Sequence, residues 1–100
     1  MTRCGGLSEA LRIARAAERD GIPVVPHAWK SGVIKAASLQ CNAVIPDALF
    51  QEYCVAETPI NQTLTKERLP VEKDGTILVP TAPGIGITLD EEVVEHYRVE

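Results

Sequence analysis

Two short runs of β-forming residues constrain what this chain can fold into more than any other feature. The first, 22–25, follows a helical pattern that we expect over 8–19. The second, 48–55, follows another helical pattern, which we expect to open near Ser31 and to stop before Pro46. The order helix, strand, helix, strand is typical of parallel β/α units. Two parallel strands leave two open edges and a large apolar face, so the sequence predicts part of a larger α/β structure.

The first helix is predicted from its apolar spacing and from the residues at its two ends. Apolar residues fall at the i, i+3, i+4, i+7 positions of one face, namely Leu7, Ala10, Leu11, Ala14 and Ala17. Ser8 is the expected N-cap, because a hydroxyl can accept a hydrogen bond from a free backbone N–H of the first turn. Gly21 is the expected C′ residue, because glycine takes the left-handed conformation without strain.

Past residue 57 the pattern changes from β/α units to short local elements. The dipeptide 74–75, Asp-Gly, is a strong turn signal and predicts an antiparallel hairpin that joins 68–72 to 76–80. After a loop rich in Pro and Gly, Asp90 is expected to cap a short final helix.

Composition excludes several functional classes. The chain has 100 residues, 45% of them hydrophobic and 24% charged, which is typical of one small globular domain. A net charge of −4 without a basic stripe argues against nucleic acid as a partner. No apolar stretch approaches the ~18 residues of a membrane span, and no signal region opens the chain, so we expect a cytoplasmic protein without a membrane partner. Cys4, Cys41 and Cys54 show no CxxC spacing, which favours reduced thiols over a disulfide framework or a zinc site.

Two residues with acid–base chemistry stand at the ends of the predicted strands. His27 follows the first run directly, and Glu52 lies in the second. If the two runs are parallel neighbours, their carboxyl ends meet at one edge, and His27 and Glu52 then come together. Taken singly, each has a simpler interpretation: a hydrogen-bonded structural histidine, and a solvated glutamate at a strand end.

Four motifs, in this order and at these separations, carry a resemblance to a known family. They are 4–10 (Cys-Gly-Gly-Leu-Ser-Glu-Ala), 21–32 (with Pro-His-Ala-Trp-Lys at its centre), 50–53 (Phe-Gln-Glu-Tyr) and 83–87 (Pro-Gly-Ile-Gly-Ile). Together they resemble the C-terminal part of the mandelate racemase and muconate lactonizing enzyme branch of the enolase superfamily, most of all its acid-sugar dehydratases. The resemblance spans essentially the whole chain.

The resemblance implies a fold and a division of the chain. The fold is α/β: the last quarter of a modified (β/α) TIM barrel, followed by a C-terminal hairpin and a short helix. Residues 1–56 are then the terminal β/α units of the barrel, and 57–100 form a segment that returns to the capping domain. The resemblance also places an orienting aspartate directly before the position of Met1.

The resemblance further implies roles for individual residues. His27 matches the general acid/base that acts on the carbon next to the substrate carboxylate, and Glu52 matches the acid that hydrogen-bonds this carboxylate and steadies the enediolate. A histidine, ionising near pH ~6.5 when unperturbed, suits such proton transfer. Trp29 is expected either to line the substrate pocket or to pack beneath the loop, and Lys30 either to meet a substrate carboxylate or to remain exposed. The family's Mg²⁺ is bound by carboxylates on earlier strands, which this sequence does not contain, so we assign no metal ligand here.

The functional expectation is therefore a fragment of a Mg²⁺-dependent enzyme. The complete enzyme would be a hydro-lyase or an epimerase/racemase acting on a hydroxy or sugar acid, and we expect the isolated chain to be inactive. Two alternatives remain: one piece of a split barrel that needs a complementing chain, and a non-catalytic α/β module that self-associates through its open strand edges.

Overall fold

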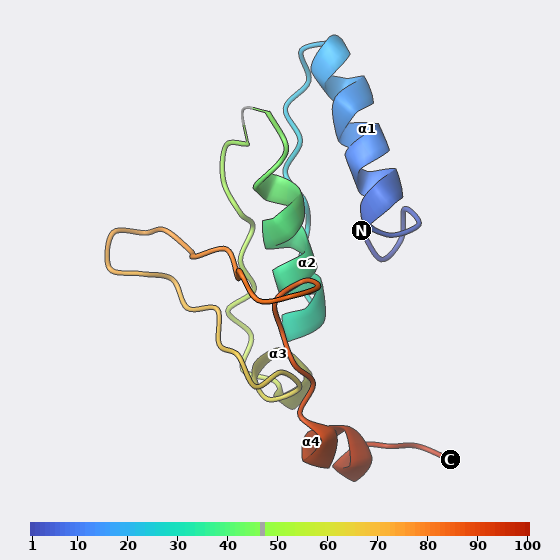
Figure 1. The fold of residues 1–100 in the computed structure, drawn as a ribbon, viewed down its shortest axis with the longest axis vertical. Helices are drawn as coiled ribbons and strands as arrows, with labels where there is room; N and C mark the ends of the chain where they lie inside the picture. Colours follow the sequence, from blue (N-terminus) through green and yellow to red (C-terminus); the bar gives the residue numbers. More distant parts are fainter. Residues whose placement is uncertain (47) are drawn as a thin grey trace.

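Four helices make up the regular structure of the computed structural model, which describes residues 1–46 and 48–100. They are α1 (Leu7–Arg19), α2 (Gly32–Asn42), α3 (Pro59–Gln62) and α4 (Glu91–His96). Helix α2 packs against both α1 and α3. Helices α1 and α4 lie at opposite ends of the molecule, and the segment between α3 and α4 includes a long loop that projects away from the helices (Figure 1). None of the described helices has the length and apolarity that a membrane crossing requires.

Helix α1 begins one residue earlier than expected, and Ser8 is not its N-cap. The N-cap is Gly6, with φ 96° and no side-chain cap, and its carbonyl accepts a hydrogen bond from Ala10 N at 3.0 Å. Because Leu7 is already helical, Ser8 lies inside the first turn, and the cap prediction was wrong. The predicted end is confirmed: Gly21 has φ 66°, and its N–H donates to Glu18 O at 3.0 Å.

Helix α2 is the centre of the packed core. It begins where the sequence predicts, after Ser31, whose Oγ accepts a hydrogen bond from Ile34 N at 3.3 Å. Most of the buried apolar residues come from this helix or lie against it: Ala14, Ala28, Ile34, Ala36, Leu39, Cys41 and Cys54. The small alanines allow α1 and α2 to approach closely.

The three cysteines are free, as expected. Cys41 and Cys54 are buried and Cys4 is half-buried. Burial raises the pKa of the Cys41 thiol, because the uncharged form is favoured away from water. Cys41 and Cys54 therefore serve as small apolar side chains of the core.

The two predicted strands, 22–25 and 48–55, do not form, and the regular structure of the described residues is helical with no β-strand. One isolated antiparallel bridge, between Thr65 and Leu89, is the β pairing found in the described residues. A strand exists only through its ladder of hydrogen bonds, and Pro23 has no N–H to give to one. A two-stranded sheet without further strands is marginal in any case. The prediction of a parallel β/α sheet within this chain was wrong.

The predicted hairpin keeps its turn but not its strands. Gly75 has φ 85°, its N–H donates to Glu72 O at 2.9 Å, and Glu72 N donates to Thr76 O at 2.8 Å. Asp74 Oδ1 accepts hydrogen bonds from Thr76 N and Oγ1, which hold the pKa of this carboxyl below its usual range. The arms belong to the loop that projects away from the helices (Figure 1), and Leu78 is 70% exposed there. The final helix is confirmed, with Asp90 Oδ1 accepting from Glu92 N and Val93 N.

Much apolar surface remains in contact with water. The chain exposes 7152 Å², compared with about 5,500 Å² for a folded monomer of this mass. Its radius of gyration is 14.3 Å, compared with about 13 Å for a compact 100-residue domain. The exposed large apolar residues include Ile22, Val44, Leu49, Phe50, Val55, Val71 and Leu78. An uncovered surface of this extent is typical of an interface with further polypeptide.

Candidate functional site

His27 and Glu52 meet in the structure, although they are 25 residues apart in the chain. His27 Nδ1 lies 2.6 Å from Glu52 Oε2, and the two side chains are 67% and 39% exposed. No ladder joins their segments. Each is held instead by a buried neighbour, since Ala28 is 1% exposed and Cys54 is 2% exposed. The expected convergence is thus present, but buried anchors bring it about rather than paired strands.

Side-chain amides fix the segment that carries Glu52. Asn61 Nδ2, from α3, donates to Cys54 O at 3.5 Å and to Ala56 O at 2.5 Å. On the other side, Asn42 Nδ2 donates to Phe50 O at 3.3 Å. These contacts do the positioning that backbone hydrogen bonds do in a sheet.

Trp29 completes the cluster. Its Nε1–H donates to Glu52 Oε1 at 3.0 Å, and its ring stacks on that of His27 with centroids 5.6 Å apart and an interplanar angle of 10°. Each carboxylate oxygen of Glu52 therefore has its own ring nitrogen partner. Trp29 remains 52% exposed, so it lies at the surface of the cluster and not beneath a loop.

A hollow of about 310 Å³ adjoins the cluster. His27, Trp29 and Lys30 line it together with residues 1–3. Lys30 is exposed and has no hydrogen bond to His27 or Glu52 among the described contacts, so the structure places it at the hollow but outside the cluster. Arg3 also lines the hollow and was not predicted, because nothing in the local pattern distinguishes it from a surface arginine. Two basic side chains make this hollow suited to an acid.

The contact with Glu52 determines which nitrogen of His27 is available for chemistry. When Nδ1–H donates to a carboxylate, the neutral ring carries its lone pair on Nε2. No described residue forms a hydrogen bond with Nε2 of His27. The arrangement therefore leaves Nε2 to accept or return a proton.

The residues around His27 do not fit a magnesium site. Mg²⁺ takes oxygen ligands in octahedral geometry and is usually held by carboxylates. Within 1–46 and 48–100, no group of three or more His, Cys, Asp or Glu side chains is placed to hold a metal ion. Glu52 is the acidic member of a cluster whose neighbouring hollow is lined by Arg3 and Lys30.

Comparison with known proteins gives the chain its relatives. Residues 1–93 match the family model described as enolase C-terminal domain-like. The chain is 33% identical to D-galactarolactone cycloisomerase of Agrobacterium fabrum, over 96% of this chain and 27% of that protein. It is 35% identical to D-xylonate dehydratase of Haloferax volcanii, over 100% of this chain and 24% of that protein.

Solved structures agree with these matches. The fold superposes on a predicted mandelate racemase from Rhodobacter sphaeroides with a TM-score of 0.87 and 34% identity, covering 98% of this chain and 25% of that one. A protein from Burkholderia xenovorans, solved bound to magnesium and fumarate, shares the fold at a TM-score of 0.81 and 21% identity, over 92% of this chain and 23% of that one.

The matches show the family to which the chain belongs and how much of each relative the chain covers. This chain spans about a quarter of the length of the relatives it matches. The described residues, which form no β-strand, thus superpose on part of a larger protein. With a family model that covers residues 1–93, the chain belongs to the enolase C-terminal domain-like family, among relatives that are acid-sugar dehydratases and cycloisomerases.

Proposed function

We propose that this chain is the C-terminal segment of a Mg²⁺-dependent, cytoplasmic enzyme that removes the proton next to the carboxylate of a hydroxy or sugar acid. The reaction would be that of a hydro-lyase or of an epimerase/racemase. The observation that supports it most is the 2.6 Å contact of His27 with Glu52 beside a hollow lined by basic residues. Relatives named D-galactarolactone cycloisomerase and D-xylonate dehydratase add to this support.

In this proposal His27 is the general acid/base, acting through Nε2. Its Nδ1 is oriented by a carboxylate, which also stabilises the imidazolium formed when a proton is taken. Glu52 would hydrogen-bond the substrate carboxylate and steady the enediolate in its protonated form. As placed here, both of its oxygens accept from ring N–H groups. In the complete enzyme it would therefore turn from His27 to the substrate, and the orienting aspartate that the resemblance implies would take over His27 Nδ1.

Trp29 and Lys30 have supporting roles in the same proposal. The indole N–H of Trp29 restrains Glu52 at 3.0 Å, so Trp29 would position the acid more than it binds substrate. Lys30, with Arg3, would attract the negative charge of the acid into the hollow.

Magnesium and the remaining strands would come from polypeptide outside this chain. Residues 1–56 would be the terminal β/α units of the barrel, and residues 57–100 the segment that returns to the capping domain. Mg²⁺ would supply charge for the second oxygen of the enediolate, and its ligands would lie on the earlier strands. For this reason the isolated chain is expected to be inactive.

A chimera tests the proposal. The last quarter of D-xylonate dehydratase from Haloferax volcanii would be replaced by this chain, which matches it over its full length. Exchange of the α-proton of sugar acids with deuterated solvent would then be followed by NMR, with Mg²⁺ present. We expect exchange in the chimera, none in the 100-residue chain, and loss of exchange in the His27→Asn chimera. A folded chimera without exchange, or Mg²⁺-dependent turnover by the chain alone, contradicts the proposal.

The exposed apolar surface also supports association of this chain with another polypeptide. Ile22, Leu49, Phe50 and Val55 are each more than half exposed, which suits either a complementing barrel chain or a second copy of this one. Light scattering after size exclusion separates these cases. A stable, cooperatively unfolding homo-oligomer would favour a self-associating module, whereas co-purification with a longer chain would favour a split barrel.

A further inference from the structure

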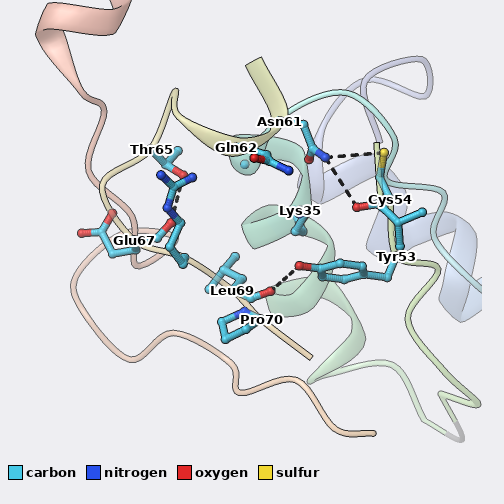
Figure 2. Close-up of a pocket in the computed structure, with 12 residues that line it drawn as sticks. Lys35, Tyr53, Cys54, Asn61, Gln62, Thr65, Glu67, Leu69 and Pro70 are labelled. Carbon is cyan, nitrogen blue, oxygen red and sulfur yellow. Dashed lines mark hydrogen bonds between the residues drawn. The ribbon is translucent and has the colours of Figure 1, made fainter. Parts of the chain in front are cut away.

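A second and larger hollow also adjoins α2, and none of the residues that line the first hollow line this one. It measures about 410 Å³ and lies between α2, the segment 53–55, α3 and the segment 65–70 (Figure 2). Polar and charged side chains line part of it, Lys35, Asn61, Glu67 and Arg68 among them.

Lys35 is a buried cation without an anionic partner. The residue is 7% exposed, and none of the ion pairs among the described residues includes it. Its Nζ lies 4.2 Å from the centroid of the Tyr53 ring, a cation–π contact. Nζ is not among the enclosed side-chain atoms that lack a partner, so it reaches open space at this wall with its charge unpaired. The ammonium at this wall therefore calls for an oxyanion.

Asn61, which lines the same hollow, has an acceptor oxygen without a donor. It is 7% exposed, and its Nδ2 is used in hydrogen bonds to Cys54 O and Ala56 O. Its Oδ1 is enclosed and has no hydrogen-bond partner. In Figure 2 Lys35 lies between the Asn61 amide and the Tyr53 ring. A molecule in this hollow would meet an ammonium that can donate, and a small turn of the Asn61 side chain would bring an unpaired acceptor to it.

The other charged groups at the hollow leave it net positive. Glu67 accepts hydrogen bonds from Thr88 N at 2.6 Å and Thr88 Oγ1 at 2.9 Å, so its carboxylate is already occupied. Arg68 is exposed and forms none of the ion pairs found among the described residues. Two cations face one committed carboxylate, which favours an anion in the hollow.

We propose that this hollow binds a small oxyanion that also carries a hydroxyl group. An oxygen of the anion would accept from Lys35 Nζ, and its O–H would donate to Asn61 Oδ1. Hydrogen phosphate and small 2-hydroxy acids have this chemistry, while sulfate and acetate have the charge without the hydroxyl. The site uses neither His27 nor Glu52, so it does not depend on the proposed enzyme function.

Matched pairs of anions test the proposal on the intact chain. Dissociation constants would be measured by NMR at mildly alkaline pH for phosphate against sulfate and for glycolate against acetate, at equal ionic strength. The first pair represents a phosphate source and the second a hydroxy-acid source, so the preferred pair identifies the ligand. The hydroxyl is expected to improve binding by roughly three- to tenfold within a pair, the effect of one hydrogen bond to a buried acceptor.

Substitutions at Lys35 provide a second test of the proposed anion site. Lys35→Met is expected to weaken binding of the preferred anion at least about tenfold, and Lys35→Arg to retain most of it. Lys66→Met is the matched control, because Lys66 is exposed and does not line the hollow. Circular dichroism would show that each variant is folded. Equal effects of Lys35→Met and Lys66→Met, no binding by the wild-type chain, or no preference for the hydroxylated member of either pair would overturn the proposal.

Discussion

Leucine is buried in the core around α2 and exposed in the segment between α3 and α4. Leu39, on α2, is 4% exposed, whereas Leu78, beyond the Asp-Gly turn, is 70% exposed. Helix α2 is covered by α1 and α3, while the loop that carries Leu78 projects from the molecule (Figure 1). Burial here depends on what covers a residue and not on its own apolarity. The projecting loop is the region whose structure would change most if further polypeptide covered it.

The first prediction uses this pair of leucines. Leu39→Ala removes buried methyl groups from a packed site, and we expect a loss of about 2–5 kcal/mol in the free energy of unfolding, enough to unfold a marginal domain. Leu78→Ala should change it by less than about 0.5 kcal/mol. Urea unfolding followed by circular dichroism measures both. Similar losses for the two variants would show that Leu78 is covered in solution.

The second prediction compares two glycines of the Pro- and Gly-rich loop. Gly84 and Gly86 have φ of 73° and 76°, so an alanine at either is strained by about 1–2 kcal/mol. A Cβ on Gly86 would also clash with Pro80 Cβ, whereas nothing lies within 4 Å of one on Gly84. We expect Gly86→Ala to be the more damaging change.

Limited proteolysis of the C-terminal segment checks this order. The Gly86→Ala chain should be cleaved near the loop faster than the Gly84→Ala chain, because the contact with Pro80 would open. Equal cleavage of the two variants would mean that Pro80 and Gly86 do not touch in solution.

Most helix ends could be predicted from the sequence, although the cap at Ser8 was wrong, and the pairing of strands could not. Ser31, Gly21 and Asp90 act within one helical turn, so their patterns suffice. The strand predictions failed because a strand needs partners that are distant in the chain. Helix α3 was not predicted, although Thr58 followed by Pro59 is a recognisable helix start.

The candidate site shows the same division. The convergence of His27 with Glu52 was expected from strand direction, but the amides and buried residues that hold them could not be foreseen from spacing. Lys35 is the opposite case: a lysine on an amphipathic helix is normally exposed, and only packing against Tyr53 reveals it as buried.

The third prediction tests which serine caps a helix. Ser31→Ala removes the acceptor for Ile34 N and should lower the free energy of unfolding by about 1 kcal/mol. Ser8→Ala should have almost no effect, because α1 begins after Gly6 without a side-chain cap. Thermal unfolding of the two variants gives the comparison. A larger loss at Ser8 would restore the cap expected from the sequence.

The smallest expected effect concerns Glu67, whose carboxylate joins the segment after α3 to Thr88. Its bonds to Thr88 N and Oγ1 hold the pKa of the Glu67 carboxyl below its usual range. A carboxyl whose pKa is lower in the folded chain adds stability above its unfolded pKa of about 4.3, and this stability is lost as pH falls through the lower folded value.

Wild type should therefore exceed Glu67→Gln slightly in stability at neutral pH, and the difference should vanish in acid. Glu57→Gln is the control, since Glu57 is exposed and forms no hydrogen bond among the described contacts. The midpoints of urea unfolding of wild type and both variants, measured from neutral to acid pH, test this prediction. A difference between wild type and Glu67→Gln that persists unchanged at low pH would mean that the bond to Thr88 is not the source. The two ends of the projecting region would then be joined by the Thr65–Leu89 bridge instead.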